Sequence, residues 1–114
     1  QLERGIYGMS NASLDTPWPK LLSAKDALSE RIEAEDEALL ALLADRSPPA
    51  DHLLPDTGVG LATERLLSTT FIIGEAYGTR ASTVLNLDRD GHWSITERSF
   101  GPNGAVLGEV ALRR

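Results

Sequence analysis

The spacing of apolar residues predicts helices in the first half of the chain. Apolar side chains recur every three or four residues from residue 18 to about 33, which predicts an amphipathic helix packed on a sheet. We expect Asp15 or Thr16 to cap this helix. A second apolar face predicts another helix over residues 35–45, and it should end before Pro48 because proline lacks an amide donor.

Alternating apolar and polar residues predict strands in the second half. Residues 81–87 alternate, and the turn-forming run 88–91 separates them from a second alternating segment, residues 92–99. A further turn at residues 101–104 leads to a last alternating strand over residues 106–112. The pattern therefore predicts an α+β fold in which helices cover an antiparallel meander.

Four other segments have weaker patterns. Short strands are expected at residues 5–10 and 69–73, and one or two helical turns at residues 61–67. Residues 48–60 are rich in Pro, Asp and Gly and lack apolar periodicity, which predicts a surface loop able to form the rim of a pocket.

Composition and charge exclude several classes of protein. The 114 residues suit one small domain, and 41% hydrophobic with 25% charged residues is ordinary globular composition. A net charge of -6 argues against nucleic acid binding, and no apolar run approaches the length of a membrane span. Zero cysteines exclude disulfides and thiolate metal sites, and they fit a cytoplasmic protein. His52 and His92 are too isolated for a metal site, so we expect neither metal nor cofactor.

Two sequence blocks resemble a known family. Residues 10–20 read SNASLDTPWPK and residues 77–85 read YGTRASTVL, and shorter matches follow the same order at residues 67–72, 88–91 and 97–100. These blocks resemble the NRDE family, also called the transport and Golgi organisation 2 family. The resemblance implies that residues 1–114 are the C-terminal part of a single NRDE-family domain, namely the C-terminal half of an αββα sandwich similar to the N-terminal nucleophile hydrolases.

The chain also departs from the family pattern. Members of the family open with Met-Cys and carry the Asn-Arg-Asp-Glu tetrapeptide near that end, whereas this chain begins at Gln1 and has neither. We therefore expect a missing N-terminal half, which would also be a partner of this segment. The Gln1 amide cannot act as a nucleophile, so the chain alone should be inactive. Without that half, exposed sheet edges could also form a homo-oligomer.

The resemblance leaves two functions open. In the first, the intact protein resembles a cysteine N-terminal nucleophile hydrolase that acts on a non-peptide amide or acyl bond. In the second, the protein keeps the fold without the chemistry and serves as a ligand-binding or trafficking protein for a lipid or haem. The implied partner is then a small-molecule acyl, lipid or haem ligand, and the fold alone does not decide between the two functions.

Two residues are candidates for catalysis. The block around Asn11 is similar to the place where cysteine amidases carry an asparagine whose amide supports the oxyanion. Alternatively, Asn11 closes a turn by bonding to nearby backbone, or belongs to a glycosylation tripeptide. Arg80 could hold a substrate carboxylate or lower the pKa of a nearby thiol, or it could form a surface ion pair.

Other residues of these blocks have substrate-binding or architectural interpretations. Tyr77 and Thr79 could line the same place as Arg80, although a tyrosine at a strand edge is more often a packed side chain. Trp18 could cover the core at the start of the helix or form a wall of an apolar pocket. Lys20 is expected to project into solvent.

Overall fold

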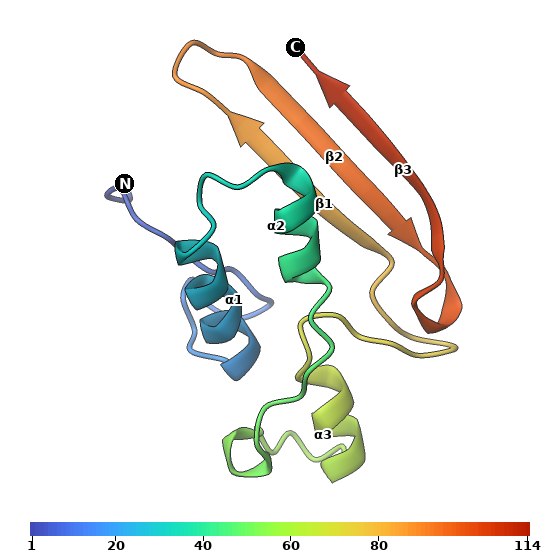
Figure 1. Ribbon diagram of the computed structural model, residues 1–114. Coiled ribbons are helices and arrows are strands. Elements are labelled where there is room, and N and C mark those ends of the chain that lie inside the picture. Colours follow the sequence, from blue (N-terminus) through green and yellow to red (C-terminus); the bar gives the residue numbers. More distant parts are fainter.

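The helices precede the strands along the chain, as Figure 1 shows for the computed structural model, which describes residues 1–114. The α-helices are α1 (Pro19–Ser29), α2 (Asp36–Leu43) and α3 (Leu61–Leu67), with a short 3-10 turn, η1 (Asp51–Leu53), before α3. The strands are β1 (Ala81–Leu87), β2 (Trp93–Phe100) and β3 (Val106–Arg113), with η2 (Pro102–Gly104) between the last two. The predicted α+β class is confirmed.

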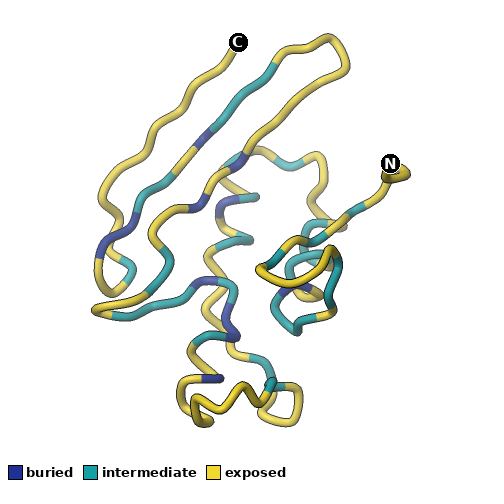
Figure 2. The backbone as a smooth tube through the Cα atoms, turned by 180° about the vertical axis from the view of Figure 1, so that it is seen from behind, coloured by how far each residue is buried: buried dark blue, intermediate teal, exposed yellow.

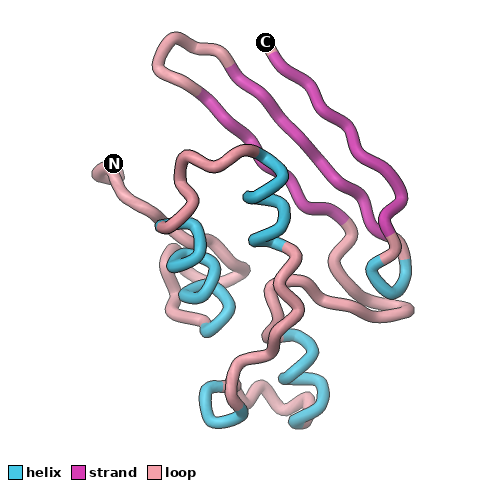
Figure 3. The backbone as a smooth tube through the Cα atoms, in the orientation of Figure 1, coloured by secondary structure: helices cyan, strands magenta, loops and turns pink.

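The three strands form one antiparallel sheet in the order β1-β2-β3, coloured magenta in Figure 3. Val84 pairs with Thr96, and Thr96 pairs with Ala111, so these side chains share one face of the sheet. The turn between β1 and β2 is closed by the Asp88 carboxylate, which accepts hydrogen bonds from the amides of Asp90 and His92 at 2.9 Å. The predicted meander is therefore confirmed, including both of its turns.

α2 covers the part of one sheet face that β1 and β2 form. Asp36, at the start of α2, accepts hydrogen bonds from the side chains of Asn86 on β1 and Thr96 on β2. Arg98 on β2 forms an ion pair with Glu37 of α2 at 2.6 Å. These contacts explain why Thr96 is buried although it is polar.

The opposite face of the sheet carries exposed apolar side chains, and we call it the bare face. Its members follow the other set of alternating positions, and Leu87, Val110 and Leu112 are 72%, 62% and 56% exposed. Figure 2 shows that β3 is exposed along its whole length. An αββα sandwich would place a second sheet against such a face, and that part of the predicted architecture remains a prediction.

The core is small and lies where the segment after α3 crosses the end of the sheet. Only 11 of 114 residues are buried, and Phe71 is the one large side chain that is almost fully enclosed, at 1% exposure. Its ring meets that of Phe100 edge to face, with centroids 4.7 Å apart, and the Arg46 guanidinium lies 5.4 Å from its centroid. The Phe71 amide donates to the carbonyl of Asp45, which joins this segment to the end of α2.

The two short strands expected at residues 5–10 and 69–73 are not present. In the first segment, Gly8 bonds to Asp15 through both its amide and its carbonyl, which closes a loop. In the second, Phe71 bonds to Asp45, and the Ile72 amide donates to the hydroxyl of Thr79. Both segments satisfy their backbone groups locally or with turns, and so neither pairs with a strand.

The predicted cap and the predicted end of the first helix were wrong. Trp18 occupies the capping position of α1 and Pro19 begins the helix, with no side-chain cap. Asp15 is used in the preceding loop instead, and Thr16 donates to the carbonyl of Ser13. At the other end α1 stops at Ser29. The helical turns at α3, the second helix and the loop before α3 agree with the sequence prediction.

Candidate functional site

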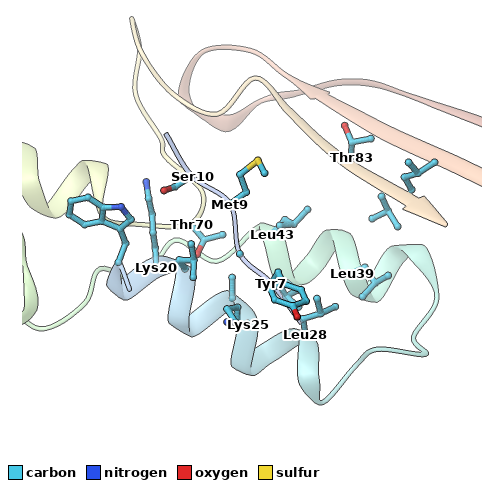
Figure 4. Close-up of a pocket in the computed structure, with 17 residues that line it drawn as sticks. Tyr7, Met9, Ser10, Lys20, Lys25, Leu28, Leu39, Leu43, Thr70 and Thr83 are labelled. Carbon is cyan, nitrogen blue, oxygen red and sulfur yellow. The ribbon is translucent and has the colours of Figure 1, made fainter. Parts of the chain in front are cut away.

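A cavity of about 430 Å³, which we call the apolar cavity, lies between α1, α2, β1 and the segment of residues 7–10. Eleven of its seventeen lining residues are hydrophobic. Figure 4 shows labelled side chains from both α1 and α2, including Leu28 of α1 and Leu39 and Leu43 of α2, around this space. Its volume is in the range that suits a small-molecule ligand.

A second cavity of about 270 Å³, which we call the polar cavity, adjoins the first. Ser10, Trp18 and Lys20 line both cavities, so these three residues form a shared wall. Only four of the twelve residues around the polar cavity are hydrophobic. The two spaces together offer an apolar compartment beside a more polar one.

Three of the five candidate site residues meet at the polar cavity. Asn11, Trp18 and Tyr77 all line it, and Trp18 reaches the apolar cavity as well. The Asn11 side chain is exposed and forms no hydrogen bond within the chain, whereas the neighbouring Ser10 hydroxyl accepts from the amide of Ala12. The side chain that bonds to the backbone at this point is therefore Ser10 and not Asn11, and the catalytic role of Asn11 stays a prediction.

The other two candidates lie outside both cavities. The Thr79 hydroxyl accepts from the Ile72 amide at 3.0 Å, and the Thr79 amide donates to the Ile72 carbonyl, so Thr79 holds the loop of residues 72–79 together. Arg80 has an exposed side chain and forms no ion pair, and its carbonyl accepts from the Phe100 amide where the meander begins. The roles predicted for Thr79 and Arg80 remain predictions.

Asp15 fixes the loop that forms one side of the apolar cavity. It adopts a left-handed backbone conformation, with φ 56°, and its carboxylate accepts from the Gly8 amide at 2.6 Å and from Lys25 at 2.9 Å. The Gly8 hydrogen bond, followed by Lys25, holds the pKa of Asp15 below its ordinary value. A Cβ on Gly8 would lie 2.5 Å from the Leu21 side chain, so only glycine lets this loop pack so closely on α1.

Lys20 is half-buried in the shared wall, contrary to the sequence prediction that it projects into solvent. Its ammonium donates to the carbonyl of Leu67, the last residue of α3, at 2.7 Å, and no carboxylate lies within ion-pair distance. Burial lowers the pKa of Lys20. One feature of the sequence could have indicated that Lys20 has a partner. A cation in the first turn of a helix interacts unfavourably with the helix dipole, so a lysine at this position is favourable only if its ammonium makes another contact.

Glu64 of α3 is a buried carboxylate that sequence analysis did not single out. It is 5% exposed and lines the polar cavity, where one of its oxygens accepts from the amide and the hydroxyl of Thr57 at 2.7 and 2.6 Å. No local pattern distinguishes it from the many exposed acidic residues, because its burial depends on the loop that precedes α3.

Asp88, Asp90 and His92 gather in the turn between β1 and β2, and none of the three lines either cavity. The Asp88 carboxylate already bonds to two amides of the turn and to the His92 ring, and the His92 hydrogen bond is the largest cause of its lowered pKa. These contacts account for the cluster as part of the turn, and all three residues are exposed.

None of the helices combines the length and the apolar character that crossing a membrane requires.

Comparison with known proteins relates this chain to one family. The family model "Transport and Golgi organisation 2" matches residues 1–102. The human transport and Golgi organization protein 2 homolog is 36% identical over 110 residues, and the match covers 87% of this chain and 40% of the human protein. The cattle and mouse homologs are 38% and 31% identical with the same coverage, so the chain spans about 40% of the length of these curated relatives. Because the family model covers nearly all of the sequence, the chain belongs to the transport and Golgi organisation 2 family.

Proposed function

We propose that this chain supplies the ligand-binding part of a protein that holds an amphipathic small molecule. The apolar portion of the ligand occupies the apolar cavity, and its polar end lies at the shared wall beside Ser10 and Asn11. The observation that carries the proposal is the adjoining pair of cavities, one apolar and one more polar, with Ser10, Trp18 and Lys20 between them. Lipids and haem, the ligands implied by the family resemblance, both have this divided character.

A variant that fills the apolar cavity tests the proposal. Ala24 lines the cavity on α1, whereas the neighbouring Ser23 is exposed and does not line it. We expect Ala24→Phe to abolish the fluorescence enhancement of Nile red, an uncharged apolar dye, and Ser23→Phe to leave it unchanged. Binding of the dye that survives in Ala24→Phe, with the helical circular dichroism intact, would show that the cavity is not the binding site.

Acyl hydrolysis by the intact protein is the second candidate. Asn11 supports it, because this exposed amide lines the polar cavity beside the space proposed for the apolar part of the ligand. In this mechanism a cysteine thiolate from outside this chain attacks the acyl carbon, the amine leaves after taking up a proton, and water then hydrolyses the thioester to the free acid and the thiol. Asn11 stabilises the oxyanion, and Arg80 serves as substrate or thiol partner. Asn11→Ala should lower kcat on an acyl amide by about 100-fold or more with little change in KM. Equal turnover by a variant of the intact protein without that cysteine would exclude the mechanism.

We also propose that another part of the intact polypeptide packs on the bare face of the sheet. The relatives are longer than this chain, and Leu87, Val110 and Leu112 are exposed on the bare face. Such a part would complete the single domain and the sandwich that the resemblance implies. Light scattering of the 114-residue chain tests this: a stable monomer that neither self-associates nor binds the remaining polypeptide would contradict it.

Cytoplasmic location is a separate prediction, which cell fractionation can check.

A further inference from the structure

The charges around the apolar cavity differ from those of the rest of the chain. The chain has 17 acidic residues against 11 lysines and arginines, yet no acidic residue lines this cavity. Its two charged lining residues are Lys20 and Lys25. We propose that Lys20 binds the carboxylate of an amphipathic monocarboxylate whose apolar chain fills the apolar cavity. This inference rests on the function proposed above and identifies the class of its ligand.

Only one of the two lysines is available for an anion. Lys25 already pairs with Asp15 at 2.9 Å, and that contact holds the loop against α1. Lys20 has the carbonyl of Leu67 as its one partner, so two of the three ammonium donors are unused. A half-buried cation without a carboxylate partner carries a desolvation cost, which a bound anion would offset.

A hydroxyl adjoins Lys20 in the shared wall. Figure 4 shows Ser10 near the ammonium end of the Lys20 side chain, and both residues line both cavities. The Ser10 hydroxyl accepts a hydrogen bond from the Ala12 amide, which leaves its proton free to be donated. An ammonium and a hydroxyl can together donate to the two oxygens of one carboxylate. A phosphate dianion would carry a second charge that no other free cation of the two cavities balances, because Lys25 is already paired with Asp15.

The polar cavity contributes one opposing charge. Glu64 is the sole acidic residue that lines either cavity, and Thr57 engages one of its oxygens through two hydrogen bonds. A carboxylate of the ligand is therefore favoured on the Lys20 side of the shared wall and disfavoured deeper in the polar cavity. This arrangement fixes the direction of the ligand, with its apolar chain toward α2.

The test compares three probes with the same twelve-carbon chain: dodecanoate, dodecanol and dodecyltrimethylammonium. Each is titrated below its micelle concentration against the intact protein loaded with Nile red, at pH 8. We expect dodecanoate to displace the dye at least about tenfold more tightly than dodecanol, equivalent to about 1.4 kcal/mol, and the cation to be the weakest. This ranking needs no variant and so does not depend on how well any variant folds.

Variants then assign the preference to one lysine. Lys20→Met should make dodecanoate and dodecanol equal, whereas Lys20→Arg should keep the preference because the cation is retained. Equal binding of the acid and the alcohol by the unmodified protein, or a tenfold preference that survives in Lys20→Met, would refute the role of Lys20 while leaving the cavity as a ligand site. Displacement by none of the three probes would instead refute the proposed function itself.

Discussion

Replacing Phe71 tests the account of the core most directly. Phe71 is the one large side chain that is almost fully buried, and it joins three parts of the molecule. Its ring packs edge to face on Phe100 of β2, its amide bonds to Asp45 after α2, and the Arg46 guanidinium faces its ring. The substitution Phe71→Ala removes the first and last of these contacts and leaves a cavity where they met.

The expected loss of stability follows from these contacts. A phenylalanine replaced by alanine in a core costs about 3 to 5 kcal/mol, a range that includes the lost aromatic pair. Phe71→Leu keeps most of the apolar volume and loses mainly the edge-to-face contact, so about 1.5 kcal/mol is expected. Small domains have about 5 to 15 kcal/mol in total, and a chain with so few buried residues should lie near the lower end. Phe71→Ala should therefore be close to unfolding at 25 °C.

Urea denaturation followed by circular dichroism measures both losses. Leu87→Ala is the matched control, because Leu87 is an apolar side chain that is 72% exposed, and its loss should change stability by less than about 0.5 kcal/mol. If Phe71→Ala is too unstable to measure, Phe71→Leu still gives a value. The explanation of the core is wrong if Phe71→Ala lowers the unfolding free energy by less than about 1 kcal/mol, or by no more than Leu87→Ala does.

Three further predictions concern the loop, the helix contact and the bare face. Because its pKa is lowered, Asp15 stabilises the fold above about pH 4, and this contribution is lost as the pH falls through the folded-state pKa. Asp15→Asn keeps the left-handed conformation but not the charge, so its Tm should be lower than that of the unmodified chain at pH 7 and should converge with it at about pH 2; a constant difference would contradict this. Asp36→Ala removes two hydrogen bonds between α2 and the sheet and should cost about 2 kcal/mol in thermal unfolding, whereas an unchanged Tm would mean that these bonds contribute nothing. The double variant Val110→Thr with Leu112→Thr should raise the monomer fraction of the 114-residue chain in light scattering, and no rise would show that the bare face does not drive association.

The meander could be predicted from sequence because its information is local. Strand alternation and the turn-forming residues between strands fix the pairing over short distances, and Gly91 supplies the positive φ, 87°, that the first turn needs. The segments at residues 5–10 and 69–73 have similar strand-like composition. Their partners, Asp15, Asp45 and Thr79, lie in loops, and no periodic pattern announces them.

The candidate site was predictable only in part, for the same reason. The family blocks pointed to Asn11, Trp18 and Tyr77, and these three residues do meet at the polar cavity. Of the apolar cavity only Trp18 was anticipated as a wall, because the rest of the lining comes from separate segments that local periodicity treats as independent core positions. The half-buried state of Lys20 depends on the carbonyl at the end of α3, which is 47 residues away in sequence.

The central position of β2 makes the two outer strands unequal. β1 and β3 pair with β2 and not with each other, so either outer strand leaves the sheet once its hydrogen bonds to β2 break. Release of β1 would also break the Asn86 contact with α2, whereas β3 has no helix over it and all of its residues are exposed. β3 is therefore the strand that detaches at the lowest cost, and an incoming strand of another polypeptide would replace it at β2 more readily than it would replace β1.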